Sequence, residues 1–221
     1  MQSNISFAIP VHNEHNELDR LLTQLLLFIR DSDEIVIQKD STVTPEVEDV
    51  IFKYSNDPKI KVIQFPLNGN YAEFKNNLKN NCRGDYIFQI DADEELGSFL
   101  LYAHEIIEQS PDIELFYISR INTVEGITEE YLSKMGWKIA SDTYNGNNII
   151  NWPDAQARLF KNIKRIKWKN KVHEQLTGFK TYTLISDVTT NIESNRKFSL
   201  IHEKTFDRQI KQNEFYKNLA K

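Results

Sequence analysis

The stretch that decides the fold is GDYIFQIDADEELG, residues 84–97. An apolar run within it ends at Ile90. Four carboxylates follow this run almost at once: Asp91, Asp93, Glu94 and Glu95. A short apolar run bounded by turn residues is typical of a buried strand. The stretch therefore predicts a buried strand whose carboxyl end carries a group of acids.

Upstream of this strand, apolar runs alternate with helical patterns. Runs rich in β-branched and aromatic residues predict strands at 5–11, 34–38, 61–65 and 86–90. Leucines at helical spacing predict a first helix with Asn16 as its N-cap, and Thr44 followed by Pro45 predicts the start of a second. A third helix is expected near 71–80. Strands alternating with helices imply a largely parallel sheet in right-handed crossover units.

The second half of the chain has a less regular pattern. It predicts a helix over 99–108, strands at 115–121, 157–160 and 198–202, and a polar terminal helix. No repeat and no linker separates the two halves, so one α/β domain is expected. Its central sheet is mostly parallel and flanked by helices, and its smaller C-terminal part is mixed.

Composition excludes several classes of protein. The 221 residues carry 27 Lys and Arg against 32 Asp and Glu, a net charge of -5, so general attraction for nucleic acid is not expected. The single cysteine, Cys82, excludes an internal disulfide and a Cys-rich zinc site, and it fits a reducing, cytoplasmic location. The sequence has no transmembrane run and no signal-peptide pattern, so a soluble, unexported chain is expected.

The two aspartates of the acidic group have a spacing that suits a metal ion. In an extended segment, residues i and i+2 point the same way, so Asp91 and Asp93 are expected to aim at one point. Mg²⁺ and Mn²⁺ take oxygen ligands, and Mg²⁺ usually leaves positions for water and substrate phosphate. The same residues also suit a solvated turn at the start of a helix, so the spacing alone leaves both readings open.

Four blocks of sequence supply the context. They are SFAIPVHNE (6–14), DEIVIQKDST (33–42), NYAEFKNNLKNNCRGDYIFQIDADEEL (70–96) and WPDAQARLFKNIKRIKWKNKVHEQLTGF (152–179). In this order and spacing they resemble family 2 glycosyltransferases of the GT-A fold with an Asp-x-Asp motif. The resemblance covers most of the chain. It implies a single GT-A domain over 1–221, with a Rossmann-like, nucleotide-sugar-binding half at 1–97 and an acceptor-side half with the C-terminal helix at 98–221.

The resemblance also implies a reaction. Such enzymes transfer a sugar from a nucleotide-sugar donor, usually a UDP-sugar, to an acceptor hydroxyl. The transfer inverts the anomeric centre, and the sugar is expected to be a hexose. Mn²⁺ or Mg²⁺ bridges the Asp-x-Asp motif and the diphosphate, where it would neutralise the charge of the leaving group. The sequence does not show whether the acceptor is a glycan, a lipid-linked molecule or a protein.

Donor-binding roles follow for the residues that match the family motifs. These are Pro10, Val11, Glu14, Asp40, Lys75, Asn76, Asp91 and Ala92. The first three would line the base and ribose, with an acid at a helix start as the alternative for Glu14. Asp40 stands in a displaced Lys39–Asp40 pair, which leaves the identity of the base open. Lys75 would reach phosphate as a point charge, with a solvated helix lysine as the alternative.

Metal ligation is expected first from Asp93, together with Asp91. Family members often complete the metal shell with one histidine, so His173 and His202 are candidates, of which at most one ligates. The alternative for either histidine is a hydrogen-bonded structural role.

Inverting displacement needs a base for the acceptor hydroxyl, and two carboxylates are candidates. Asp154 ranks slightly ahead of Glu174, and the alternative for either is a structural carboxylate paired with a neighbour such as Arg158. Arg158 would either clamp phosphate or hold Asp154. Trp152 would form a wall of the acceptor site, although tryptophans are more often core residues.

Two other functions stay open. One is nucleotidyl transfer to a sugar phosphate, which IPVHNEHNE (9–17) disfavours because it lacks a Gly-rich phosphate loop. The other is a non-catalytic nucleotide-sugar-binding module. The basic segment 161–171 predicts a half-exposed hairpin in preference to a nucleic-acid patch. The thin apolar stripe of the terminal helix favours a solvated helix, with peripheral membrane contact as the alternative.

Overall fold

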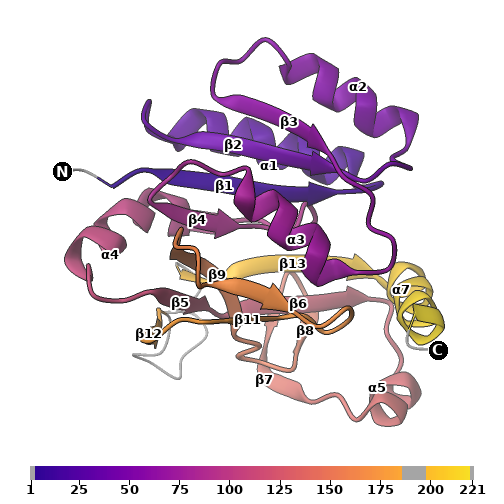
Figure 1. Cartoon of the computed structure of the whole chain (residues 1–221). Helices are drawn as coiled ribbons and strands as arrows, with labels where there is room; N and C mark the ends of the chain where they lie inside the picture. The colour runs from indigo at the N-terminus through magenta and orange to yellow at the C-terminus, as the bar shows by residue number, and fades with distance from the viewer. Residues whose placement is uncertain (1–2, 186–197, 220–221) are drawn as a thin grey trace. The chain divides into compact units, whose positions relative to one another are not determined.

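The computed structural model describes residues 3–185 and 198–219 (Figure 1). Contacts divide the chain into two compact units. The first comprises Met1–Glu94, Leu100–Tyr117 and Ala157–Thr183, and the second comprises Glu95–Phe99, Ile118–Gln156 and Leu184–Lys221. These stretches interleave along the chain, and the division into a donor-binding half at 1–97 and an acceptor-side half at 98–221 stays a prediction. That the chain acts as one domain stays a prediction.

The first unit begins with the expected alternation of strands and helices. In chain order its elements are β1 (Ile5–Val11), α1 (His15–Phe28), β2 (Glu34–Lys39), α2 (Pro45–Tyr54), β3 (Ile60–Gln64), α3 (Tyr71–Asn80) and β4 (Tyr86–Gln89). Later segments add α4 (Ala103–Gln109), β5 (Leu115–Ile118), β9 (Gln156–Lys161), β10 (Lys167–Lys169), β11 (Gln175–Thr177) and β12 (Tyr182–Leu184). The strands and helices predicted up to residue 90 are therefore confirmed.

A seven-stranded sheet forms the centre of the first unit, in the order β12-β5-β9-β4-β1-β2-β3. Strand β1 is parallel to β2 and β4, and β2 is parallel to β3. Strand β9 is antiparallel to β4. The mostly parallel sheet confirms the predicted α/β class. Because ligands bind beyond the carboxyl ends of parallel strands, the ends of β1, β2 and β4 mark the edge where a site is expected.

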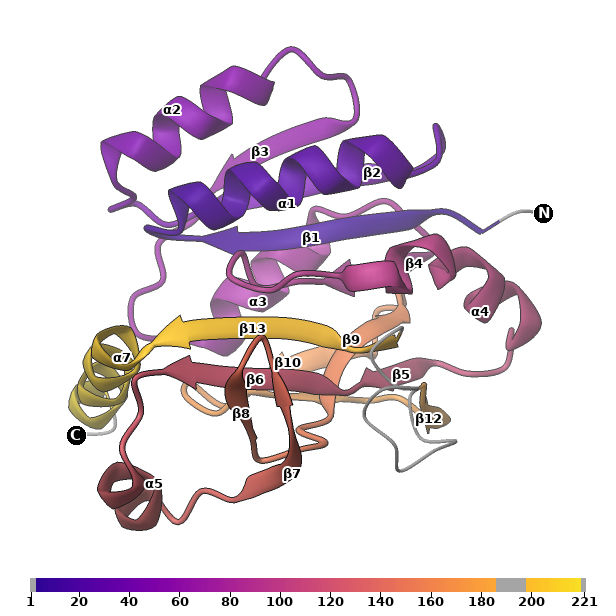
Figure 2. The same ribbon diagram turned by 180° about the vertical axis from the view of Figure 1, so that it is seen from behind.

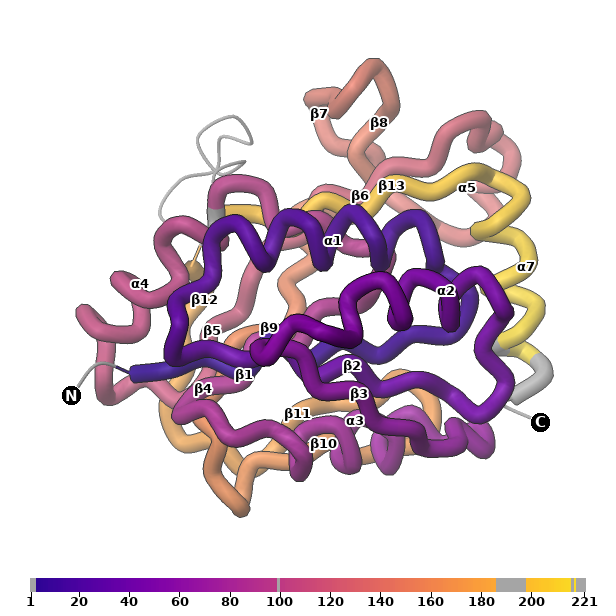
Figure 3. Tube along the Cα trace, turned by 90° about the horizontal axis from the view of Figure 1, so that it is seen from above, coloured from indigo at the N-terminus to yellow at the C-terminus, as the bar shows by residue number. Residues whose placement is uncertain are grey.

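Helices α1 and α3 cover opposite faces of this sheet (Figures 2 and 3). On the face of α3, a buried apolar cluster joins the helix to the sheet and to the β10–β11 hairpin. Its members include Ala8, Leu78, Ile87, Phe160 and Trp168. Buried Trp168 lies between two exposed lysines of β10, which agrees with the half-exposed hairpin expected over 161–171.

The second unit contains a four-stranded sheet in the order β13-β6-β8-β7. Its elements are β6 (Arg120–Glu125), α5 (Glu129–Met135), β7 (Ile139–Tyr144), β8 (Asn147–Ile150), β13 (Leu200–Thr205) and α7 (Phe206–Leu219). Strand β13 is parallel to β6, and β8 is antiparallel to both β6 and β7. Side chains of β6 and β8 form two small buried clusters that stabilise this sheet.

Three predicted elements need correction. Helix α1 begins at His15 with Glu14 in the cap position, so the predicted N-cap Asn16 is wrong. The strand predicted over 115–121 is two strands, because buried Ser119 interrupts it and its carbonyl accepts the N–H of Leu200. The helix predicted over 99–108 is divided into a 3₁₀ helix, Gly97–Leu101, and α4.

No helix within the described parts of the chain is both long enough and apolar enough to cross a membrane.

Phe88 on β4 is expected to be essential for the stability of the first unit. It is 0% exposed, and its ring centroid lies 5.9 Å from that of Phe7. Phe88→Ala should lower the free energy of unfolding in urea by about 3–5 kcal/mol, because it leaves a cavity in the core. Phe52 on α2 is 80% exposed and provides a matched control. Phe52→Ala should change the same quantity by less than about 0.5 kcal/mol, and equal losses for the two variants would contradict the prediction.

Candidate functional site

The chain turns immediately after β4. The N–H of Glu94 donates to the carbonyl oxygen of Asp91 over 2.9 Å, closing a four-residue turn over 91–94, called the acidic turn below. The extended backbone assumed for Asp91 and Asp93 is therefore wrong. Ala92, 3% exposed, and Asp93 occupy the central positions of a turn, where the alternation of side chains along a strand does not apply. Whether the two aspartates share a cation stays a prediction.

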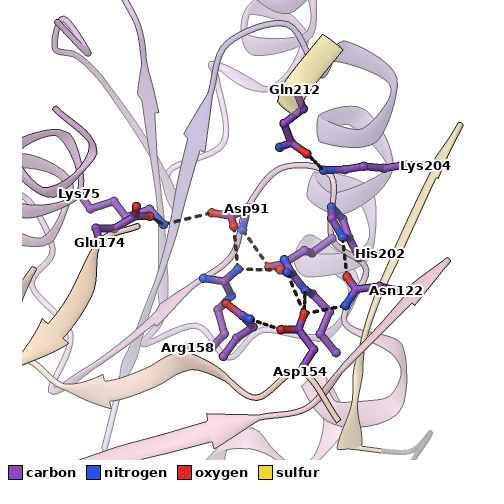
Figure 4. Close-up of polar contacts among 12 residues, drawn as sticks. Lys75, Asp91, Asn122, Asp154, Arg158, Glu174, His202, Lys204 and Gln212 are labelled. Atoms are coloured by element: carbon purple, nitrogen blue, oxygen red, sulfur yellow. Dashed lines mark hydrogen bonds and ion pairs between the residues drawn. The ribbon is translucent and has the colours of Figure 1, made fainter. Parts of the chain in front are cut away.

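Arg158 holds the acidic turn from the neighbouring strand β9. It is 3% exposed, and its Nη2 donates to Oδ2 of Asp91 over 2.6 Å and to Oε1 of Glu94 over 2.7 Å (Figure 4). Burial disfavours the charged guanidinium, but the charges of the two carboxylates outweigh it, so the pKa of Arg158 is raised. Arg158 therefore keeps its positive charge beside the end of β4.

Lys75 brings a second buried cation to the same place. This residue of α3 is 7% exposed, and its Nζ lies 2.5 Å from Oε1 of Glu174 and 3.8 Å from Oδ1 of Asp91 (Figure 4). The ammonium also lies 4.9 Å from the ring centroid of Trp168. The alternative of a solvated helix lysine is therefore wrong. Each carboxylate oxygen of Asp91 faces a cation, Arg158 on one side and Lys75 on the other.

Two further carboxylates order the loops that follow β1 and β2. Oε2 of Glu14 accepts the backbone N–H groups of His12, over 2.9 Å, and of Asn13, over 3.0 Å. Oδ1 of Asp40 accepts the backbone N–H groups of Ser41, over 2.7 Å, and of Leu67, over 2.9 Å. Both predicted donor-binding acids therefore shape backbone at the carboxyl edge of the sheet.

Pro10 and Val11 close β1 at this same edge. They lie opposite Gln38 and Lys39 of β2 in the parallel pairing. The side chain of Val11 is buried in the core, so Val11 contributes its backbone to the edge: its carbonyl accepts the N–H of Asp40.

Asn76 is committed to the β10–β11 hairpin. Its Nδ2 donates to the carbonyl oxygen of Trp168 over 2.8 Å, and its Oδ1 accepts the N–H of Trp168 over 2.9 Å. The amide thus fixes β10 against α3. It also sets the position of the indole beneath the ammonium of Lys75.

In the second unit, Asp154 is surrounded by hydrogen-bond donors. Its Oδ2 accepts from Nε of Arg120 over 2.9 Å and from Nδ2 of Asn122 over 2.6 Å, and its Oδ1 accepts from Nε2 of Gln156 over 2.9 Å (Figure 4). Burial raises the pKa of the carboxyl, but the charge of Arg120 and the hydrogen bonds outweigh this and lower it. The arginine paired with Asp154 is thus Arg120, and not Arg158 as the sequence suggested.

His202 is linked to Asp154 through Asn122. The parallel pairing of β13 and β6 places His202 opposite Asn122, and its Nδ1 lies 2.8 Å from Oδ1 of Asn122. Trp152 packs against Ile121 and Ile149, as the core alternative predicts. His173 is exposed in the β10–β11 connection with a positive φ of 55°. Metal ligation by either histidine stays a prediction.

The acidic turn has suitable chemistry for a divalent cation that is shared with a ligand. Among residues 3–185 and 198–219, no group of three or more His, Cys, Asp or Glu side chains is arranged to hold a metal by itself. Mg²⁺ usually takes one or two protein carboxylates and fills its other positions with water and phosphate. Asp91 and Asp93 supply carboxylates of the type that this mode of binding uses, and whether they hold a cation together with a phosphate stays a prediction.

Several residues around Asp91 and Asp154 were given no role in the sequence analysis, although Glu94 was counted among the acids after the strand. They are Glu94, Arg120, Asn122 and Gln156. The sequence did contain a signal for the contact of Glu94 with Asp91 and for the common orientation of Arg120 and Asn122. Glu94 stands three residues after Asp91, the spacing at which a turn closes. Arg120 and Asn122 alternate on a strand and therefore point to the same side of it.

Comparison with known proteins identifies the family. The model of the family described as Glycosyl transferase family 2 matches residues 6–182. The chain belongs to glycosyl transferase family 2. Among curated relatives of this family 2 chain, an uncharacterized protein, y4gI, of Sinorhizobium fredii is 28% identical over 130 residues, 56% of this chain. An uncharacterized glycosyltransferase of Haemophilus influenzae is 24% identical over 94 residues, 42% of this chain.

Solved structures share the fold of this family 2 chain. The crystal structure of S. aureus TarS 1–349 matches 92% of the chain with a TM-score of 0.55 and 14% identity. The same protein in complex with UDP matches 83% with a TM-score of 0.50 and 16% identity. This likeness supports the GT-A-like fold. The chain spans 14% and 35% of the lengths of the two curated relatives and 60% of the TarS chain.

Asp154 should stabilise the second unit of this family 2 chain only above a certain pH. Because its pKa is lowered on folding, its contribution is full above the unfolded value of about 4 and is lost as the pH falls through the folded value. Asp154→Asn should therefore reduce the free energy of urea unfolding by about 1–3 kcal/mol at pH 7. The difference from wild type should shrink as the pH is lowered below about 4.

Glu125→Gln is the matched control, because Glu125 is exposed on the same strand as Arg120. It should change unfolding by less than about 0.5 kcal/mol at pH 7. A difference for Asp154→Asn that stays constant from pH 7 to pH 3 would contradict the assignment.

Proposed function

We propose that this chain transfers a sugar from a nucleotide-sugar donor to an acceptor hydroxyl, with inversion at the anomeric carbon. Membership of glycosyl transferase family 2 supports sugar transfer in general. The structural likeness to TarS in complex with UDP supports a UDP-sugar as the first donor to test. A hexose as the transferred sugar is part of the proposal.

The observation that carries the proposal is the charge arrangement at the carboxyl end of β4. Asp91 lies between the buried cations Lys75 and Arg158, at distances of 3.8 and 2.6 Å. Parallel sheets bind ligands beyond this end of their strands. Lys75 and Arg158 are already paired with Asp91, Glu94 and Glu174, so this group suits a divalent cation, which would stabilise the negative charge that develops on a departing diphosphate.

The loops after β1 and β2 would receive the nucleoside. Pro10 and Val11 end β1, and Glu14 and Asp40 hold the adjacent loops by accepting backbone N–H groups. This bonding keeps the loops in one conformation before the donor arrives, which lowers the entropy lost on binding. Lys75 would then supply charge to the phosphates.

A divalent cation, Mn²⁺ or Mg²⁺, would be held by Asp93 and Asp91. When bound, such an ion supplies positive charge to the leaving diphosphate. The contribution of the chain is to orient the carboxylate of Asp91. Arg158 does this through the ion pair at 2.6 Å.

Two carboxylates remain candidates for the base that accepts the hydroxyl proton. Glu174 lies 2.5 Å from the ammonium of Lys75 and is engaged in that ion pair. The lowered pKa of Asp154 keeps the carboxyl ionised but also makes it a weaker base, so its candidacy depends on geometry. We rank Asp154 first because its donors hold one carboxylate orientation.

Replacing Asp93 is the direct test of the metal-dependent reaction. Asp93→Asn should lower the Mn²⁺-dependent release of UDP from UDP-sugars by about 100-fold or more, because the leaving group loses electrostatic stabilisation. Urea unfolding should show that the variant remains folded.

Asp49→Asn is the matched control, since Asp49 is an exposed acid on α2, and it should keep full activity. Full activity of Asp93→Asn would refute the metal assignment. Calorimetry that detects binding of UDP with Mn²⁺, combined with no turnover of any UDP-, GDP- or dTDP-sugar, would instead favour a binding module.

A further inference from the structure

We propose that Glu94 is a positioning residue that holds the acidic turn in the shape that presents Asp91 and Asp93 to the donor diphosphate. The inference rests on the proposed function and deepens it. Glu94 is 1% exposed, so it acts through Asp91 and Arg158 and does not contact the donor itself.

Two hydrogen bonds join the ends of the acidic turn. The N–H of Glu94 donates to the carbonyl oxygen of Asp91 over 2.9 Å, which is the ordinary closure of such a turn. In the opposite direction, the N–H of Asp91 donates to Oε2 of Glu94 over 3.1 Å. The side chain of Glu94 thus closes the turn a second time, and the backbone between its ends has little freedom.

Arg158 connects this closed turn to the sheet. A single atom, Nη2, donates to Asp91 over 2.6 Å and to Glu94 over 2.7 Å. Arg158 lies on β9, whose next residue, Leu159, is paired with Phe88 of β4. Arg158 therefore ties the acidic turn to β9, the strand that is paired with β4.

Exposure divides the roles among these charged residues. The side chains of Glu94 and Arg158 are 0% and 3% exposed, whereas that of Asp91 is 30% exposed. Water cannot replace the contacts of the buried pair, so they hold their geometry. The partly exposed carboxylate of Asp91 can be reached by a ligand, while Glu94 and Arg158 fix its orientation.

Stability alone does not account for this pair. A buried ion pair is often no more stabilising than apolar side chains of similar volume, because desolvation offsets the attraction between the charges. Here the pair lies directly beside Asp91, and both of its members bond to that residue. Positioning of Asp91 explains why a charged pair is present.

The experiment compares Glu94→Gln with wild type in two measurements. Calorimetry with Mn²⁺ alone and with Mn²⁺ plus UDP should show affinity weakened by about 10- to 100-fold, as is typical when a residue that supports a metal ligand is changed. Amide hydrogen exchange of residues 91 and 94, measured without ligand, should become about tenfold faster because the closure of the turn weakens.

The double variant Glu94→Met with Arg158→Met separates positioning from stability. Its midpoint of urea unfolding should lie close to that of wild type, because apolar side chains replace the buried pair. Its affinity for Mn²⁺ plus UDP should remain weakened. Glu114→Gln is the control, since it breaks an ion pair with Arg165 in the same unit, and it should bind both probes like wild type.

Unchanged affinity and unchanged exchange in Glu94→Gln would overturn the proposal. Recovery of affinity in the stable double variant would also overturn it, because the pair would then be only structural. If the wild-type chain binds neither Mn²⁺ nor UDP, the proposed function fails. Exchange at residues 91 and 94 then decides the role of Glu94 by itself: faster exchange supports it, and unchanged exchange refutes it.

Discussion

A guanidinium that is 3% exposed needs carboxylate partners, because a buried charge without a counter-ion costs several kcal/mol. Arg158 has two, Asp91 and Glu94, on a single nitrogen atom. Both acids belong to the turn that follows β4. The requirement of one buried cation thus determines the shape of the segment from which the proposed donor site is built, and it ties that segment to the central sheet.

The topology of the first unit makes this pairing possible. Strand β9 enters the sheet antiparallel beside β4, and the pairing of Leu159 with Phe88 brings Arg158 to the end of β4. Helix α3 packs on one face of this sheet together with the β10–β11 hairpin. It supplies Lys75, whose ammonium lies over the indole of Trp168. Charges from a strand, a helix and the β10–β11 connection therefore meet where parallel strands end.

The second unit holds its carboxylate differently. Asp154 is less buried than Glu94 and accepts hydrogen bonds from one cation, Arg120, and from two neutral amides. The neutral amides orient the carboxylate of Asp154 without bringing in a further positive charge that would itself need a counter-ion. The register of β13 against β6 then extends this group to His202 through Asn122.

Local patterns in the sequence were enough to predict the strands and helices up to residue 90, because a period of two or of 3.6 residues is read over a few neighbours. They also located the acids at the end of β4 and the family motifs. They could not choose the partners of those acids: Arg158 lies 67 residues after Asp91, and Glu174 lies far along the chain from Lys75. They left open whether residues 91–94 form an extended segment or a turn, and they could not show that Arg158 bonds to Glu94, since that contact requires β9 to lie beside β4. The sequence by itself determined which residues carry charge and which segments become strands; only the tertiary structure decided which charges meet, because contacts between distant residues depend on strand order and register.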